Sequence, residues 1–276
     1  MKSNYYQAAL AADALSLGPH WVYDQEKLAR LYPDGITDFS DPASSYHSNR
    51  KAGQLTHFGD QMVLLKSSLE SGQYDETRWQ ERWLAGMADY DGYLDGATKE
   101  TLANQGSSPS SSSYLSGASR LAPILDLDLT PDAKVAAARS QTALTHGDPG
   151  VQECAEFFVR ATLAVEGGAT FSKAFQQAAA EGDFPHLNPV AHLERVAKAG
   201  GNYLQAGKEL GLACGLSDAF PLTLYMALRE GATFQSAISE NGLAGGDTSP
   251  RAMLFALLFE ARDLGSASCR APTNPE

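Results

Sequence analysis

Two acidic residues lie at the starts of strongly apolar segments, where they could hold an ion or move a proton. Asp247 precedes an apolar run within AGGDTSPRAMLFALLFEA, residues 244–261. Asp60 follows a short polar turn, residues 56–59, and precedes a second apolar run. Because paired carboxylates can bind a divalent cation or share acid–base work, Asp60 and Asp247 are candidate catalytic residues.

The segment around Asp247 predicts the start of a buried helix. Ser249 can cap this helix and Pro250 suits its first position, so Asp247 is not needed as the cap. Gly245 and Gly246 allow the backbone to approach another group closely, and helix N-termini favour anions. A plainer role for Asp247 is to complement the helix dipole, which is worth about 0.3–1 kcal/mol. The sequence leaves both roles open.

Three further acids have similar alternatives. Asp60 can be an ordinary helix cap. Asp13 lies inside an apolar helical pattern, where a buried charge needs a partner or marks a site, unless the residue faces solvent. Asp148 lies two residues after His146 and could orient its imidazole, although a lone histidine is more often a packed or solvated residue.

The composition excludes several classes of protein. The net charge is −12, and no cluster of Lys and Arg is visible, so we expect no nucleic-acid partner and no anionic membrane surface as partner. No apolar window is long enough to span a membrane. The three cysteines, Cys154, Cys214 and Cys269, are odd in number and widely spaced, which fits a reducing compartment. We therefore expect a cytoplasmic protein.

Helical periodicity recurs along the whole chain, and no segment alternates long enough to predict a strand. The sequence therefore predicts one all-α domain over residues 1–276, with a core at about 6–262 and a tail at 263–276. The low-complexity stretch at residues 104–113 fits a solvated surface loop or a mobile lid beside a site. Dinucleotide-binding, P-loop, metalloprotease and Gly-x-Ser-x-Gly motifs are absent from the sequence, so a Ser or Cys nucleophile has no support.

Four stretches in this order resemble the ADP-ribosylglycohydrolase family: ADALSLGPHWVYD, SGASRLAP, THGDP and GGDTSPRA. That family includes the glycohydrolase that reactivates dinitrogenase reductase and the J-class crystallins. The resemblance implies an orthogonal helical bundle with a central cleft. It also implies hydrolysis of an N- or O-glycosidic bond to ADP-ribose with two Mg²⁺ ions.

The resemblance also implies roles for individual residues. Weak metal ligands would be Thr56, Asp60 and Asp247. Substrate-binding residues would be Asp13, His57, Ser116, Gly117, His146, Asp148, Gly245, Gly246 and Thr248. The substrate would be a small molecule or an ADP-ribosylated partner.

The chain departs from the family pattern at the expected metal ligands. Where active members carry Thr-Asp-Asp-Thr, this sequence reads THFGDQ at residues 56–61, with His57 and Phe58 after the threonine. In the last motif Ser249 and Pro250 replace an acid and a threonine. Because hard cations need several oxygen ligands, we expect no binuclear Mg²⁺ centre. A single, partly hydrated ion on Asp60 and Asp247 remains open, and the pattern is closer to the crystallin-like branch.

Two functions remain open at this stage. The first is a hydrolase acting on ADP-ribose or a smaller ribosyl compound, with Asp60 or Asp247 as general base and His146 assisting. The second is a crystallin-like binding or structural protein that has lost catalysis. For the first, we expect the carboxylates of Asp60 and Asp247 within about 10 Å of each other in one cleft.

Overall fold

The computed structural model describes residues 4–69, 72–229 and 231–263. Cys269 and nearly all of the predicted tail, residues 264–276, lie outside these ranges. Within them the chain is helical, and its only β-type pairings are two isolated bridges, which confirms the all-α prediction. The helices are α1 (Tyr5–Ser16), α2 (Gln25–Leu31), α3 (His57–Ser68), α4 (Glu76–Ala88), α5 (Gly96–Ala103), α6 (Ser116–Ser119), α7 (Ala122–Leu125), α8 (Pro131–Ala143), α9 (Pro149–Glu166), α10 (Phe171–Glu181), α11 (Pro189–Lys198), α12 (Tyr203–Leu210), α13 (Leu216–Leu228), α14 (Phe234–Ala244) and α15 (Thr248–Arg262).

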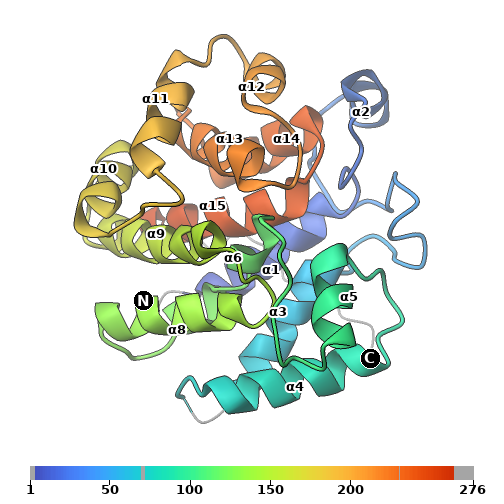
Figure 1. Cartoon of the computed structure of the whole chain (residues 1–276). Helices are drawn as coiled ribbons and strands as arrows, with labels where there is room; N and C mark the ends of the chain where they lie inside the picture. The colour runs from blue at the N-terminus through green and yellow to red at the C-terminus, as the bar shows by residue number, and fades with distance from the viewer. Residues whose placement is uncertain (1–3, 70–71, 230, 264–276) are drawn as a thin grey trace.

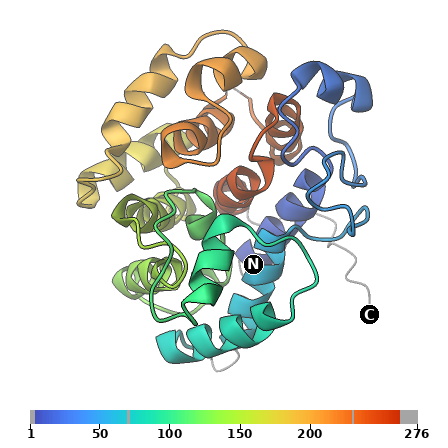
Figure 2. The same ribbon diagram turned by 45° about the vertical axis from the view of Figure 1, so that its right-hand side comes forward.

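The helices α1 and α15 pack against each other at the centre of the molecule, although they come from opposite ends of the chain. Helices α9, α13 and α14 also pack against α15. In Figure 1, α11 to α14 lie above this centre and α3 to α5 lie below it on the right; Figure 2 gives a second view. Neighbours on most sides explain why α15 is apolar nearly all round, as its sequence predicts.

A smaller second core lies where α4 covers α3. Trp79 and Trp83 on α4 are fully buried there, beside Leu65 of α3 and Ile124 of α7. The buried residues of α4 are Trp79, Trp83 and Met87, which recur at helical spacing, so only one face of this helix contributes to the core. This smaller core supports α3 and with it the polar turn that precedes α3.

The start of α15 differs from the sequence prediction. The helix begins at Thr248, and Asp247 occupies the N-cap position without accepting a hydrogen bond from the helix backbone. Ser249 is therefore inside the helix, and its hydroxyl donates to Asp13 rather than acting as a cap. The prediction of Ser249 as the cap was wrong because a tertiary hydrogen bond takes its side chain.

The low-complexity stretch at 104–113 is held to the body of the molecule at Ser110. The Ser110 side chain is buried, and both its backbone N–H and its hydroxyl donate to the carbonyl of Thr145. Its own carbonyl accepts from the backbone N–H of Gly147. Most other residues of the stretch are exposed, as in a surface loop.

None of the helices in the described ranges has the length and apolar character needed to cross a membrane.

Candidate functional site

Asp13 joins three helices. Its fully buried carboxylate accepts hydrogen bonds from the Thr56 backbone N–H (2.8 Å), the Thr56 hydroxyl (2.6 Å) and the Ser249 hydroxyl (2.5 Å). A Cβ at Gly59 would lie 2.2 Å from this carboxylate, so α3 can approach α1 only with glycine there. Burial raises the pKa of Asp13 to about 6, against the lowering effect of these hydrogen bonds. Asp13 thus acts as a structural link between α1, α3 and α15.

Asp247 is equally buried but has fewer partners. Its Oδ1 accepts a hydrogen bond from the indole N–H of Trp21 at 3.0 Å, and the His20 Nε2 lies 3.8 Å from the same oxygen. Its Oδ2 has no hydrogen-bond partner among the described residues. Burial raises the pKa of Asp247 to about 6, and the nearby Arg251 guanidinium opposes this shift.

Three buried histidines lie beside Asp247. The rings of His47 and His57 stack with centroids 5.3 Å apart, and His47 Nε2 lies 3.1 Å from His57 Nδ1. The ring of His20 is 5.5 Å from that of His47 and stacks on Trp21 at 4.4 Å. Burial lowers the pKa of His47 to about 3 and that of His20 well below its ordinary value. These two imidazoles are therefore neutral at physiological pH.

Unpaired polar atoms are concentrated in this region. Among the described residues, eight buried side-chain polar atoms lack a hydrogen-bond partner. Six of them belong to this neighbourhood, on His20, His47, Arg50, His57, Asp247 and Arg251. Because buried polar groups in native proteins are almost always paired, such a concentration marks a region built for more than packing.

A cavity of 290 Å³ opens next to this cluster, and we refer to it as the aromatic cavity. Its walls hold six aromatic side chains and one carboxylate. The lining residues are Trp21, Tyr23, Tyr46, Phe58, Tyr93, Asp95, Gly96, Tyr114, Ser116 and Cys214. Three of the tyrosines are about half exposed: Tyr23 (51%), Tyr46 (49%) and Tyr114 (44%). Exposed aromatic rings around one cavity are typical of a ligand-binding site.

Asp95 is the carboxylate of the aromatic cavity. It is the N-cap of α5, where one oxygen accepts from the Thr98 backbone N–H at 2.7 Å. The other oxygen lies 3.8 Å from His57 Nε2. Burial acts to raise the pKa of Asp95, but His57 and Thr98 lower it more, so that the carboxyl is ionised at neutral pH. Sequence analysis missed this residue, although an acid followed by glycine before a helix was the available signal.

Asp60 lies outside this lining. Its Oδ2 accepts hydrogen bonds from the Arg50 guanidinium at 2.7 Å and the Tyr90 hydroxyl at 2.5 Å, and its side chain is 26% exposed. Thr56, not Asp60, caps α3, because its hydroxyl oxygen accepts from the backbone N–H of Phe58. The two proposed catalytic acids, Asp60 and Asp247, therefore have separate hydrogen-bond partners within the described chain.

The structure places His146 behind the cavity wall. Its Nδ1 lies 2.9 Å from the Thr145 hydroxyl and its Nε2 lies 3.5 Å from the hydroxyl of Ser116, which lines the cavity. Burial lowers the pKa of His146 to about 3. Asp148 instead caps α9 and accepts from the Gly150 backbone N–H at 2.8 Å. The hydroxyl of Thr145, rather than the carboxylate of Asp148, is therefore the group seen to orient this imidazole.

The two glycines before Asp247 serve close packing of the chain on itself. Both have positive φ, 86° at Gly245 and 73° at Gly246. Gly246 exchanges backbone hydrogen bonds with the segment of Trp21 and Val22, at 2.8 and 2.9 Å. A Cβ at Gly246 would lie 2.3 Å from the carbonyl oxygen of Leu212. These glycines thus allow close approach to other backbone segments of the protein. The hydrogen bonds of Gly246 hold Trp21 in place at the cavity.

Two other predicted binding residues also have structural contacts. The hydroxyl of Thr248 donates to the Ser16 carbonyl at 3.3 Å and lies 3.4 Å from His20 Nδ1. A Cβ at Gly117 would lie 2.6 Å from the His146 ring, so glycine is needed where α6 covers that histidine. Both residues therefore shape the groups behind the aromatic cavity.

The side chains at the expected metal ligands do not fit two Mg²⁺ ions. The described residues contain no group of three or more His, Cys, Asp or Glu side chains placed to hold a metal ion. Asp247 accepts a hydrogen bond from the Trp21 indole, and the hydroxyls of Thr56 and Ser249 donate hydrogen bonds to Asp13. A single ion on Asp60 and Asp247 would lie close to the Arg50 guanidinium, which already pairs with Asp60 at 2.7 Å.

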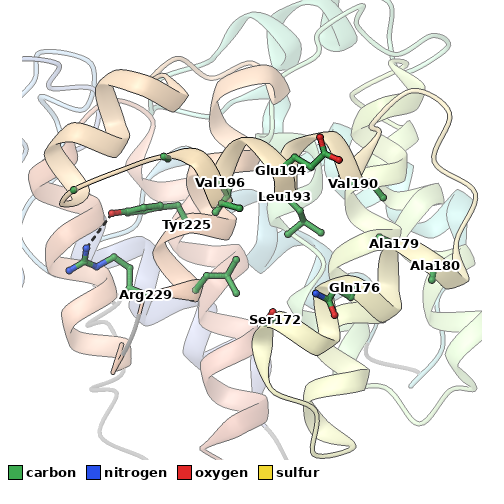
Figure 3. Close-up of a pocket in the computed structure, with 14 residues that line it drawn as sticks. Ser172, Gln176, Ala179, Ala180, Val190, Leu193, Glu194, Val196, Tyr225 and Arg229 are labelled. Carbon is green, nitrogen blue, oxygen red and sulfur yellow. Dashed lines mark hydrogen bonds between the residues drawn. The ribbon is translucent and has the colours of Figure 1, made fainter.

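A second hollow, of 790 Å³, lies between α10, α11 and α13 (Figure 3). Its walls are mainly alanine, valine and leucine. The one arginine there, Arg229, is paired with Glu240 at 2.8 Å and donates to the Tyr225 hydroxyl at 3.2 Å. This hollow is mainly apolar, with Glu194 and Arg229 as its charged residues, whereas the aromatic cavity combines rings with the buried carboxylate of Asp95.

Comparisons with known proteins agree with the fold. A solved structure described as an "ADP-ribosylglycohydrolase-related protein complex" superimposes with a TM-score of 0.65. The match covers 94% of this chain and 86% of that one at 17% sequence identity, which indicates a shared fold. No curated protein matches this sequence. The family model for ADP-ribosylglycohydrolase matches residues 7–259. The chain belongs to the ADP-ribosylglycohydrolase family, whereas its place in the crystallin-like branch stays a prediction.

Proposed function

We propose that this protein hydrolyses a ribosyl glycosidic bond in the aromatic cavity without a metal, with Asp95 as the general base. Membership of the family supports a glycohydrolase-type function. The observation that carries the proposal is the position of Asp95, a buried carboxylate in the wall of a cavity otherwise lined by rings and small polar groups. This replaces Asp60 and Asp247, which do not line the cavity, as the first candidate for the base.

The chemistry needs few groups. Glycosidic cleavage passes through an oxocarbenium-like transition state, in which the sugar carries positive charge. An ionised carboxylate in a cavity of low dielectric stabilises that charge. Because the pKa of Asp95 is lowered, it accepts the proton of the water as that water bonds to the cationic sugar and becomes strongly acidic. Asp95 is fixed for this task because the Thr98 backbone N–H holds one of its oxygens and His57 faces the other. His57 is a positioning residue in this scheme.

The lining also bears on the substrate. No lysine or arginine is among the described residues that line the aromatic cavity. A diphosphate needs cations or backbone N–H groups to offset its charge, and an ionised carboxylate repels it. The cavity therefore favours a ribosyl compound whose sugar and base enter while any phosphate remains outside.

A non-catalytic binding protein is the second candidate. Two acids in the family's motif segments, Asp13 and Asp247, are fully buried and hydrogen-bonded within the protein. In this case the aromatic cavity would bind the same ligand class without turnover.

The test is turnover of ribosyl substrates by the purified protein in the presence of EDTA. We expect released ribose from the wild type and a loss of about 10²–10⁴-fold in Asp95→Asn, the range for removal of a general base. Asp75→Asn is the matched control, since Asp75 is also a helix N-cap acid, on α4 and exposed. Turnover that requires Mg²⁺ would contradict the metal-free scheme, and binding without turnover would favour the second candidate.

A further inference from the structure

We propose that the aromatic cavity selects a positively charged planar group, so that the substrate is an N-riboside whose base is a cation. The hydrolytic part of this inference rests on the proposed function, whereas the binding preference does not. The observations behind it are the arrangement of the rings, the sign of the only charge in the lining, and the chemistry of the neighbouring groups.

The rings have the composition and arrangement that favour cations. Trp21, Tyr46 and Tyr93 lie at interplanar angles of 77–80° to one another, with centroids 4.9 to 5.4 Å apart. Faces of Trp and Tyr attract cations electrostatically, and quaternary ammonium groups are bound in this way. The ammonium of Lys99 already lies 5.5 Å from the centroid of Tyr93, which shows that this ring accepts a positive charge on one side.

The cavity has one charge, and it is negative. Burial raises the pKa of the Tyr23 and Tyr93 phenols and of the Cys214 thiol, so these lining groups are neutral. Asp95 is ionised, and no lysine or arginine among the described residues shares the lining with it. Behind Asp95 lie the His57 imidazole, at 3.8 Å, and the buried Arg120 guanidinium, which interacts with the carboxylate electrostatically but does not line the cavity. A cationic ligand would complete this pairing inside a region of low dielectric.

A cationic base also suits the reaction. The water oxygen bonds to the anomeric carbon as the carbon–nitrogen bond breaks, and the electron pair of that bond goes to the ring nitrogen. The base therefore leaves as a neutral molecule, and the water proton passes to Asp95 and then to solvent. No acid has to protonate the leaving group, which matters here because His47 and His146 are neutral and Asp13 and Asp247 lie outside the lining.

The experiment compares two ligands of the same shape and different charge. The first is 1-methylnicotinamide, a planar cation, and the second is 3-methylbenzamide, in which carbon replaces the charged nitrogen. Calorimetry on the wild-type protein should show the cation binding about 10-fold more tightly, the scale of a desolvated cation–π contact. Equal affinities, or a preference for the neutral isostere, would overturn the inference.

Two variants locate the preference. Asp95→Asn keeps the α5 cap, because asparagine caps helices as well as aspartate does, and it should lower the affinity ratio several-fold. The Asp75→Asn control should keep the wild-type ratio. Tyr46→Leu removes a half-exposed ring and should weaken the cation several-fold more than the neutral ligand. A ratio unchanged in both Asp95→Asn and Tyr46→Leu would place the charge preference elsewhere.

The two proposals fail in different ways. If the protein prefers the cation but releases no ribose, the hydrolase proposal is wrong and the proposed cation-binding site stands. Hydrolysis of neutral-base ribosides at the same rate as cationic ones would remove the charge preference and leave the hydrolase. Circular dichroism melting of each variant establishes that the compared proteins are folded.

Discussion

Asp13 and Asp247 are both carboxyl groups removed from water, but they differ in how many hydrogen bonds they accept from the protein. Both are fully buried, and burial raises the pKa of each to about 6. Asp13 accepts three hydrogen bonds from Thr56 and Ser249, whereas Asp247 accepts one from Trp21 and leaves its second oxygen without a partner. Both oxygens of Asp13 thus accept hydrogen bonds from the protein, whereas one oxygen of Asp247 can still accept one.

The surroundings of the two acids also differ: Asp13 lies among packed helices, and Asp247 lies beside the aromatic cavity. The donors to Asp13 link α1 to α3 and to α15, both of which pack against it. The Trp21 indole that donates to Asp247 also forms part of the wall of the aromatic cavity. We infer that the Asp13 region holds the helices together, and that the Asp247 region supports the floor of the candidate site.

The largest expected effect is that of Asp13→Ala. The change leaves the Thr56 backbone N–H and the Ser249 hydroxyl without their acceptor at a fully buried position, so we expect the free energy of unfolding to fall by about 2–5 kcal/mol. Asp247→Ala should stay within about 1 kcal/mol of the wild type, because it removes an incompletely paired buried charge. Urea denaturation measures both. Equal losses in the two variants would erase the difference drawn here.

A second prediction concerns what holds the start of α15. Gly246→Ala should cost about 2–4 kcal/mol, since it adds a backbone clash with Leu212 to the strain of a positive φ. Gly72→Ala is the matched control, with φ of 76° and nothing within 4 Å of the added Cβ, and should cost only about 1 kcal/mol. Thermal and urea unfolding compare them. If the two costs are equal, close packing at Gly246 does not position the head of α15.

The third prediction uses the raised pKa of Asp247. Because the folded-state pKa is about 6 and the ordinary value is 3.8, the folded state binds the proton more tightly. The contribution of this acid to stability is therefore fully present below pH 3.8 and is lost as the pH rises through 6. Asp247→Asn keeps an acceptor for Trp21 without titrating. Its stability relative to the wild type should rise by about 1–2 kcal/mol between pH 5 and pH 7. A difference that does not change with pH would show that Asp247 is not a desolvated carboxyl.

The helices that build the centre were readable from the sequence, because burial leaves a regular apolar pattern along α1, α9 and α15. The exact start of α15 was not readable, since it depends on backbone bonds between Gly246 and the segment of Trp21 and Val22. Those contacts join residues more than two hundred positions apart, and no local pattern encodes them.

The candidate site was only partly predictable for a related reason. An acid that precedes a long apolar helix, such as Asp247, is recognisable in the sequence as a candidate. The helix α5 is short and mostly polar, so no such pattern marks Asp95. His20, Trp21 and His47 belong to segments without regular structure, and their importance arises only when packing stacks their rings. Sequence motifs therefore located the neighbourhood, and tertiary contacts supplied most of the lining.

The smallest expected effect tests whether Asp60 belongs with Asp247. Asp60 is paired with Arg50 and Tyr90, and the two acids share no hydrogen-bond partner in the described part of the chain; burial raises the pKa of both, and His57 acts against this rise in each. In a double-mutant cycle of Asp60→Asn and Asp247→Asn, we expect the unfolding free energies to add within about 0.5 kcal/mol. A coupling above about 1 kcal/mol would instead indicate a shared water or ion. Repeating the cycle with Mg²⁺ separates these cases, because only a bridging ion makes the coupling depend on the metal.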